Sequence, residues 1–156
     1  MFVLPRKIKA LVPILSLLIV GCASSGKEFL YDHPEVNSGE ILSLHNRISE
    51  IEKKYPENIH LETVATNTLS SHHLVVIRDK EPLHYHANHD GWAMALEGKG
   101  DLVLGEKTFA IRPGSSVFIP RGMRHKAINR GRKPLAAFVI FTPPYDGKDT
   151  IPVEEK

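Results

Sequence analysis

Hydrophobic and polar positions divide the chain into three parts with different periods. Leu11 to Val20 is an apolar run broken only by Ser16. Residues 38–54 have apolar positions three and four apart, the period of one helix face. From Ile59 to Phe141, apolar and β-branched residues come in short runs separated by Gly, Pro, Asn and Asp. Such regularly spaced short runs predict the strands of a β-sandwich or β-barrel.

The short runs define the predicted strands. We expect strands near residues 59–65, 72–78, 83–87, 92–97, 101–104, 107–111, 116–119, 125–129 and 135–141. Turn residues separate several of them, as in Glu97-Gly98, Leu104-Gly105 and Pro113-Gly114. The sequence therefore predicts one all-β domain over residues 57–142 and a loose, proline-containing tail over residues 143–156.

The amphipathic segment predicts one helix before the strands, within residues 38–56. Its apolar stripe consists of Ile41, Leu44, Ile48 and Ile51. Pro56 ends the pattern, because proline removes a backbone donor and does not continue a helix. We expect the stripe to pack on the outside of the β domain. A homodimer contact through the same stripe is the alternative.

The N-terminal apolar run has the features of a signal peptide. It follows three basic residues, Arg6, Lys7 and Lys9, and has no acidic residue before it. Ten residues at about 1.5 Å each cannot cross a hydrocarbon core of about 30 Å, so a transmembrane helix is not expected. We interpret residues 1–21 as a secretory signal.

The end of this segment resembles the lipobox of bacterial lipoproteins. Residues 19–25 read Ile-Val-Gly-Cys-Ala-Ser-Ser, with Cys22 as the only cysteine of the chain. The resemblance implies cleavage before Cys22, acylation of its sulfur and amino group with palmitate-type chains, and a tether over residues 22–37. It places the protein on a membrane, facing the periplasm or the cell exterior. With Ala23 after the cysteine, the outer membrane is expected in a Gram-negative host. An ordinary secretory signal with a chance cysteine is the alternative.

The charge of the mature chain excludes one class of partner. The formal net charge is +2, but residues 1–21 contribute three basic groups and no acid. The remainder has 17 basic and 18 acidic groups, a net charge of −1. No basic excess is present to neutralise phosphates, so nucleic-acid binding is not expected.

Three of the nine histidines lie in a pattern that suits a metal ion. His84 and His86 are two positions apart in a predicted strand, so their side chains project to the same face. His125 begins a distant predicted strand and would complete a set of three imidazoles. Five others we interpret as surface or structural residues: His33, His45, His60, His72 and His73. Imidazole ligands suit Zn, Fe, Ni and Cu, and Mn where oxygen ligands join.

The surroundings of these histidines resemble the two motifs of the cupin superfamily. Its second motif is Gly, five residues, Pro, one residue, Gly, two residues, His, three residues, Asn. All five fixed positions are filled here, by Gly114, Pro120, Gly122, His125 and Asn129.

The first cupin motif is matched only in part. It reads Gly, five residues, His, one residue, His, three or four residues, Glu, six residues, Gly. His84, His86 and Gly98 fit, but the leading glycine is replaced by Arg78 and the glutamate by Gly91. The resemblance covers roughly residues 60–142.

The resemblance implies a double-stranded β-helix, the jelly-roll barrel of cupins, preceded by the one helix. It implies a divalent ion (Fe, Mn, Zn or Ni) on His84, His86 and His125. Because Gly91 cannot supply the fourth ligand, three arrangements stay open: three histidines alone, His89 as the fourth ligand, or Asp90. A metal-free binding pocket is a further alternative.

The resemblance fixes the function only broadly, because cupins include enzymes and binding proteins. The first interpretation is a metal-dependent enzyme, oxygenase- or isomerase-like, acting on a small polar or carbonyl-bearing molecule. The second is a lipid-anchored protein that binds a small molecule or metal without turnover. Candidate pocket residues are Gly91, Trp92, Met94 and Arg121.

Overall fold

The computed structural model describes residues 30–31 and 42–155. The predicted signal peptide, Cys22 and most of the predicted tether lie outside these residues. Strand β1 (Leu30–Tyr31) pairs antiparallel with β2 (Leu42–Ser43) ahead of the main domain. In the described part of the chain, no helix has both the length and the hydropathy to cross a bilayer.

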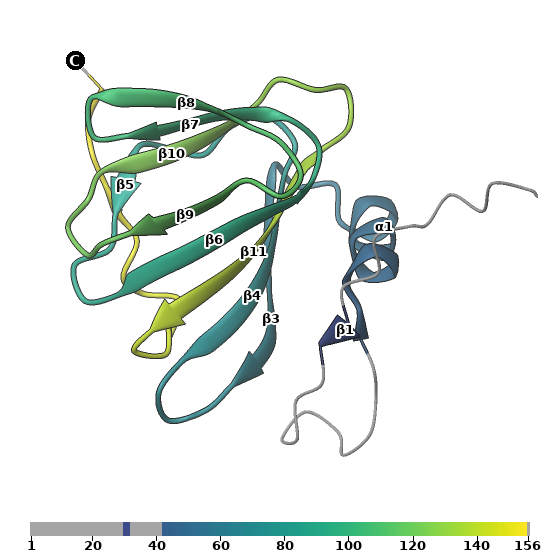
Figure 1. The fold of residues 1–156 in the computed structure, drawn as a ribbon, viewed down its shortest axis with the longest axis horizontal. Helices are drawn as coiled ribbons and strands as arrows, with labels where there is room; N and C mark the ends of the chain where they lie inside the picture. The colour runs from purple at the N-terminus through teal and green to yellow at the C-terminus, as the bar shows by residue number, and fades with distance from the viewer. Residues whose placement is uncertain (1–29, 32–41, 156) are drawn as a thin grey trace, which may run out of the picture.

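The main domain consists of two antiparallel five-stranded sheets that face each other (Figure 1). In sheet order, the first contains β12 (Ile151–Pro152), β5 (His84–Tyr85), β10 (His125–Asn129), β7 (Gly100–Leu104) and β8 (Lys107–Ile111). The second contains β3 (Ile59–Thr66), β4 (Ser71–Ile77), β11 (Leu135–Thr142), β6 (Asp90–Glu97) and β9 (Ser116–Ile119). Neighbouring strands are mostly distant in sequence, as in a double-stranded β-helix. The predicted fold class is confirmed.

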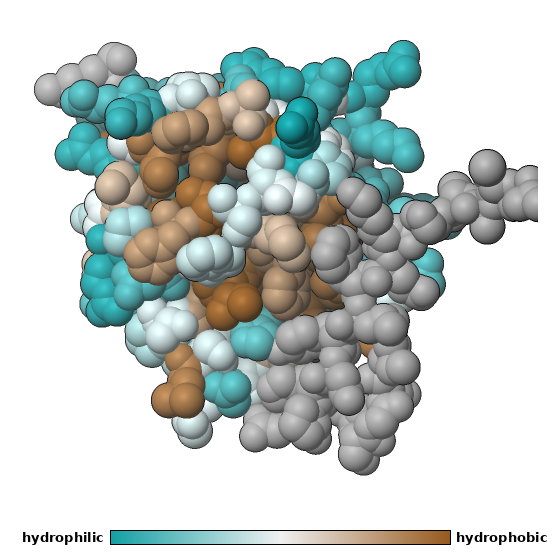
Figure 2. Space-filling view, in the orientation of Figure 1, coloured by the Kyte–Doolittle hydropathy of each residue, from teal (hydrophilic) through white to brown (hydrophobic). Residues whose placement is uncertain are grey.

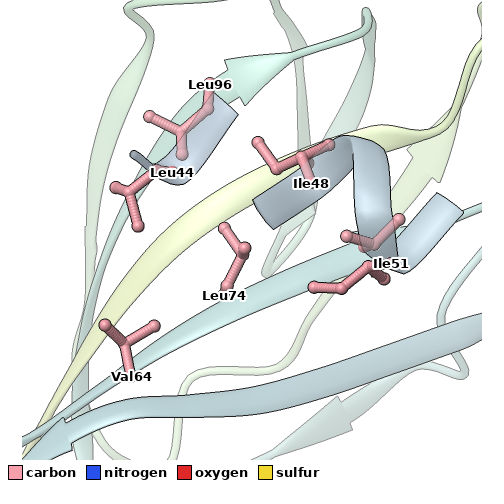
Figure 3. Packing of buried hydrophobic residues seen from close by; sticks show 8 residues of the cluster. Leu44, Ile48, Ile51, Val64, Leu74 and Leu96 are labelled. Atoms are coloured by element: carbon pink, nitrogen blue, oxygen red, sulfur yellow. The ribbon is translucent and has the colours of Figure 1, made fainter. Parts of the chain in front are cut away.

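Helix α1 (Leu44–Lys54) lies against the outer face of the second sheet. Its buried residues Leu44, Ile48 and Ile51 meet residues of the sheet in one hydrophobic cluster, shown in Figure 3. These three residues of the predicted stripe therefore pack on the barrel within one chain, whereas Ile41 lies outside the described residues. They are not available for the alternative homodimer contact, because these three side chains are at most 3% exposed.

The helix begins later than the pattern predicts, at residue 44 instead of 38. Ser43 is extended and its Oγ accepts a hydrogen bond from the Asn46 N–H, which caps the first turn. The other end is held by Arg78, whose guanidinium donates to the carbonyl oxygens of Glu52, Tyr55 and Glu57. Arg78 stands where the cupin motif has glycine, and it fastens the helix to β4.

The C-terminal segment is not the loose tail that its prolines suggest. Strand β12 pairs with β5, and Asp149 is only 7% exposed. The Asp149 carboxylate accepts the backbone N–H groups of Ala87 and Asn88, which follow β5. These contacts are between residues about 60 positions apart in the chain, so local composition gives no sign of them.

Candidate metal centre

Three histidines from two neighbouring strands meet inside the barrel. His84 on β5 and His125 on β10 are cross-strand partners, and His86 follows β5 on the same side. One ring nitrogen from each lies within 4.8 Å of the other two. The His84 and His125 ring centroids are 4.3 Å apart, and His86 lies 5.2 Å and 5.3 Å from them. The sequence-predicted triad therefore converges on one point.

Each of these rings is held by its Nδ1 atom. The Nδ1–H groups donate to backbone carbonyl oxygens: His84 to Pro82 at 2.8 Å, His86 to Asp149 at 2.7 Å and His125 to Met123 at 2.9 Å. A carbonyl can only accept, so the proton of each neutral ring is on Nδ1. This leaves the Nε2 lone pair of each ring available for an ion.

Burial keeps two of the rings neutral. His84, His86 and His125 are 7%, 6% and 6% exposed. Desolvation lowers the pKa of His125 to about 4, and the neighbouring His84 and His86 lower it further. Desolvation is also the main cause that lowers the pKa of His86. Three buried, oriented imidazoles are a donor set that fits a divalent transition metal.

A carboxylate missed by the sequence analysis lies in the same cavity. Glu81 lines the cavity, and its Oε2 accepts the Ala127 N–H at 2.8 Å. Burial raises the pKa of Glu81, whereas the nearby His84 acts in the opposite direction. Between Lys80 and Pro82, this residue looks like part of a surface turn. Only the approach of β10 to the start of β5 places it inside.

The cavity has a volume of about 220 Å³ and opens between the two sheets. Its walls come from inward positions of both sheets, including Val75, Ile77, Ala93 and Val139, with the three histidines at one end. Tyr145 and Thr150 of the C-terminal segment also contribute to the lining. The histidine set thus borders a space that admits a small molecule.

Comparison with known proteins supplies the family. The sequence profile of the cupin domain matches residues 73–141. An uncharacterised protein of Aquifex aeolicus is 41% identical over 85 residues, which are 54% of this chain and 69% of that protein. This chain belongs to the cupin superfamily.

Solved structures agree with the fold. The TT1209 protein of Thermus thermophilus superimposes with a TM-score of 0.56 and 23% identity, over 63% of this chain and 95% of its own. A cupin-2 domain protein of Shewanella frigidimarina gives a TM-score of 0.53 and 17% identity, over 64% and 91% of the two chains. At these identities the likeness concerns the fold alone.

Gly91, which replaces the motif glutamate of this cupin, lines the cavity. It is the cross-strand partner of Phe141. A Cβ atom at this position would lie 3.4 Å from Cε1 of the Phe141 ring. The Phe141 ring therefore lies within van der Waals distance of a side chain at position 91, where the motif has a carboxylate.

The two alternative fourth ligands lie outside the histidine cluster. Asp90 forms an ion pair with Arg121 on the surface. Hydrogen bonds from the Arg121 side chain and backbone lower the pKa of Asp90 to about 2. Both ring nitrogens of His89 face oxygen acceptors, the Asp149 carboxylate at 2.6 Å and the Pro144 carbonyl at 3.2 Å. Among the described residues, the cluster consists of the three histidines.

Three of the four predicted pocket residues do not line the cavity. Trp92 and Met94 alternate with the cavity-lining Gly91, Ala93 and Ala95, so they are on the outer face of β6. Trp92 is 53% exposed and Met94 packs against the helix cluster. Figure 2 shows hydrophobic side chains gathered over β6 and β9.

Arg121, the fourth pocket candidate, is half-exposed in its ion pair with Asp90 and does not line the cavity. Its own backbone N–H also donates to Asp90, at 2.8 Å. Both residues thus serve to fix the loop before β10.

A second group of hydrogen bonds supports His86. The backbone carbonyl of Asp149 accepts its Nδ1–H, while the Asp149 carboxylate binds the chain at residues 87–89. Burial alone would raise the pKa of Asp149, but hydrogen bonds from Asn88, His89 and Ala87 outweigh burial and lower it. The C-terminal segment thus holds one of the three rings in place.

Proposed function

We propose that this chain is a metal-dependent cupin enzyme that acts on a small molecule in the cavity beside His84, His86 and His125. The observation that carries the proposal is the set of three buried rings, each with Nδ1 bound to a backbone carbonyl and Nε2 turned to a shared point. Such a set holds a divalent ion with open positions for a further ligand. Fe, Mn, Zn and Ni are the candidate ions.

A bound ion would supply Lewis-acid chemistry or O₂ activation. The chain itself provides the other groups. Glu81 lies in the same cavity with a pKa raised by burial, so its carboxyl group is placed to donate or accept a proton there. Phe141 and Tyr145 pack around His86 and limit the access of water. This arrangement favours an isomerase-like proton transfer, with oxygenase chemistry as the other reaction type.

A second candidate function is binding without turnover. The observation in its favour is the mainly apolar lining of the cavity outside the histidines and Glu81. A binding protein needs no acid or base at this place, whereas an enzyme does. Glu81 is the residue that separates the two candidates.

The test is turnover in a metabolite mixture. Metal-loaded protein is incubated with a cell metabolite extract, and substrate loss and product formation are followed by mass spectrometry. We expect a compound that is converted by the native protein but not by His86→Ala, and that is bound but converted at least about a hundredfold more slowly by Glu81→Gln. A compound that co-purifies unchanged with all three proteins would support the binding protein instead.

We also propose that the chain is anchored to a membrane through lipid on Cys22, facing the periplasm or cell exterior. The proposal is supported by the order of the first residues, in which basic residues precede an apolar run that ends at Gly21-Cys22. In a Gram-negative host the outer membrane is the proposed location. A homodimer is a further prediction, but the stripe of α1 does not supply its contact.

A further inference from the structure

The cavity is apolar on the walls that lead away from the histidines. Side chains from both sheets form these walls, among them Val75, Ile77, Leu102, Val117, Ile119 and Val139. The cavity lining contains no lysine or arginine from the described part of the chain. A phosphate or sulfate on the body of a substrate would therefore find no counter-charge there, and its desolvation would be unfavourable.

The hydroxyl groups of the lining are mostly engaged within the protein. Tyr145 Oη and Thr150 Oγ1 form a hydrogen bond of 2.6 Å with each other. Ser115 Oγ accepts the Arg112 N–H at 3.1 Å. Ser116 is exposed. A sugar-like body with several hydroxyl groups would have few partners inside, so its own hydrogen bonds with water would be lost without replacement.

The imidazole and carboxyl groups of the lining lie close together. These are the three histidines and Glu81, and Phe141 forms an apolar wall beside Gly91. The lining also includes Leu61, an apolar side chain that is 43% exposed. The cavity is thus polar at the histidines and Glu81 and mainly hydrophobic elsewhere.

We propose that the substrate is a small hydrophobic molecule with an uncharged body and one oxygen-bearing end that reaches the histidines and Glu81. This rests on the proposed metal site and names its substrate class. The volume of about 220 Å³ limits the molecule to a short alkyl chain or a single ring, since pockets for drug-sized ligands are about 300–1,000 Å³. Sugars and phosphorylated compounds are excluded by the lining.

The test uses aliphatic hydroxamates, which share one metal-binding end and differ in chain length. Binding to Zn²⁺-loaded protein is measured by calorimetry for the series from acetohydroxamate to hexanohydroxamate, with gluconohydroxamate as a polar-bodied match. Burial of each added CH₂ should tighten binding by about fourfold. Gluconohydroxamate should bind no more tightly than acetohydroxamate.

Two variants test whether the increase in affinity with chain length arises inside the cavity. Ala93→Leu fills the cavity and should weaken the longest hydroxamate by about tenfold or more, and acetohydroxamate by much less. Val139→Thr keeps the side-chain shape and should reduce the increase in affinity per added CH₂. This variant serves as the test if Ala93→Leu does not fold. The matched control is Ala110→Leu, on an exposed position of β8 outside the cavity, which should leave every affinity unchanged.

The outcomes separate the two claims. Affinity that is equal along the series, or tighter binding of gluconohydroxamate, would overturn the hydrophobic substrate class and leave the metal site intact. A protein that binds neither Zn²⁺ nor acetohydroxamate would overturn the proposed function itself. A rise in affinity with chain length that Ala93→Leu abolishes would support the inference.

Discussion

Each histidine of the triad uses one ring nitrogen to bind the backbone and presents the other to the cavity. Because the acceptors are carbonyl oxygens, the same contacts fix the tautomer and the direction of the ring. The rings are therefore oriented before an ion arrives. Preorganisation of this kind lowers the cost of binding, since little side-chain freedom remains to be lost.

Stability of the metal-free protein should fall in mild acid. The pKa of His125 and of His73 is lowered to about 4 by burial. Between pH 6.5 and about 4 the unfolded chain binds more protons than the folded chain, so the free energy of unfolding decreases as pH falls. The loss is about 3 kcal/mol for each fully shifted group, complete below pH about 4. Urea unfolding with chelator at pH 7 and pH 4.5 measures it.

In the same experiment, His73→Gln measures how much one buried imidazole contributes to the pH dependence of the free energy of unfolding. His73 is 1% exposed and bonded to Ser71 and Thr63, and it is not one of the proposed ligands. The variant should show a smaller decrease between the two pH values than the native chain. Equal stability of the native chain at pH 7 and pH 4.5 would contradict the buried neutral state of these rings.

The triad could be predicted from sequence because its residues obey local rules. The i and i+2 spacing puts His84 and His86 on one face, and the spacing of the second motif identifies His125. Glu81 and Asp149 could not be found in this way. Each joins the site through a contact with a strand or loop far along the chain, and neither stands in a local pattern.

The face of β6 shows a second limit of sequence patterns. Alternation separates Gly91, Ala93 and Ala95 from Trp92 and Met94, but it does not say which set lies inside. The predicted pocket residues came from both sets, with Gly91 from one and Trp92 and Met94 from the other. The structure has the small ones inside, because they leave the space that the cavity occupies, while helix α1 covers Met94 on the outer face.

At the scale of elements, the strands follow the predicted runs closely. The bounds of the nine predicted strands agree with the structure within two residues, because each is delimited by turn residues. The order of the strands in the sheets could not be derived from these runs. It depends on pairing between distant segments, which the motif resemblance alone supplied.

Removal of the helix contact should destabilise the whole domain. Ile48→Ala deletes a side chain that is 1% exposed between α1 and the second sheet, so it should cost about 2–5 kcal/mol of unfolding free energy. The control Lys53→Ala, on an exposed position of the same helix, should change it by less than about 0.5 kcal/mol. Both are measured by urea denaturation. Equal values for the two variants would show that α1 is not docked as described.

The C-terminal segment should tighten metal binding without touching the ion. Asp149→Ala removes the carboxylate that fixes residues 87–89, next to His86. We expect Zn²⁺ affinity to fall by about 10–100-fold, the usual effect of a lost outer-shell partner. Competition with a chelator of known affinity gives the constant.

The matched control for this segment is Asp146→Ala. Asp146 is exposed, and its carboxylate accepts the Lys148 N–H within the segment's own turn. Its loss should leave Zn²⁺ affinity unchanged. If Asp149→Ala behaved like Asp146→Ala, the C-terminal segment would have no part in holding His86.

At the scale of the whole molecule, the barrel is proposed to be tied to a membrane. Cys22→Ser should abolish incorporation of labelled palmitate and move the protein from the membrane fraction to the soluble fraction, because the acyl chains are the anchor. Ser24→Ala is the control that keeps the cysteine. Membrane retention of Cys22→Ser without label would contradict lipid anchoring.

The barrel brings together residues that are about 40 positions apart, His84 with His125, as partners on adjacent strands. Cupin membership accounts for this architecture, and the local hydrogen bonds account for the orientation of the rings. Gly91 replaces the glutamate of the cupin motif and lies beside Phe141. The surroundings of the proposed ion therefore differ from those that the motif implies. The account as a whole depends on one ion held by three imidazoles.

Metal content of the purified protein tests that claim most directly. Elemental analysis by mass spectrometry should find about one divalent transition-metal ion per chain in the native protein and in the His45→Ala control, whose imidazole lies on the exposed side of α1. His84→Ala, His86→Ala and His125→Ala should each contain far less while keeping the native circular dichroism. Full metal content in any of these three folded variants, or its absence from the native protein after metal loading, would contradict the account.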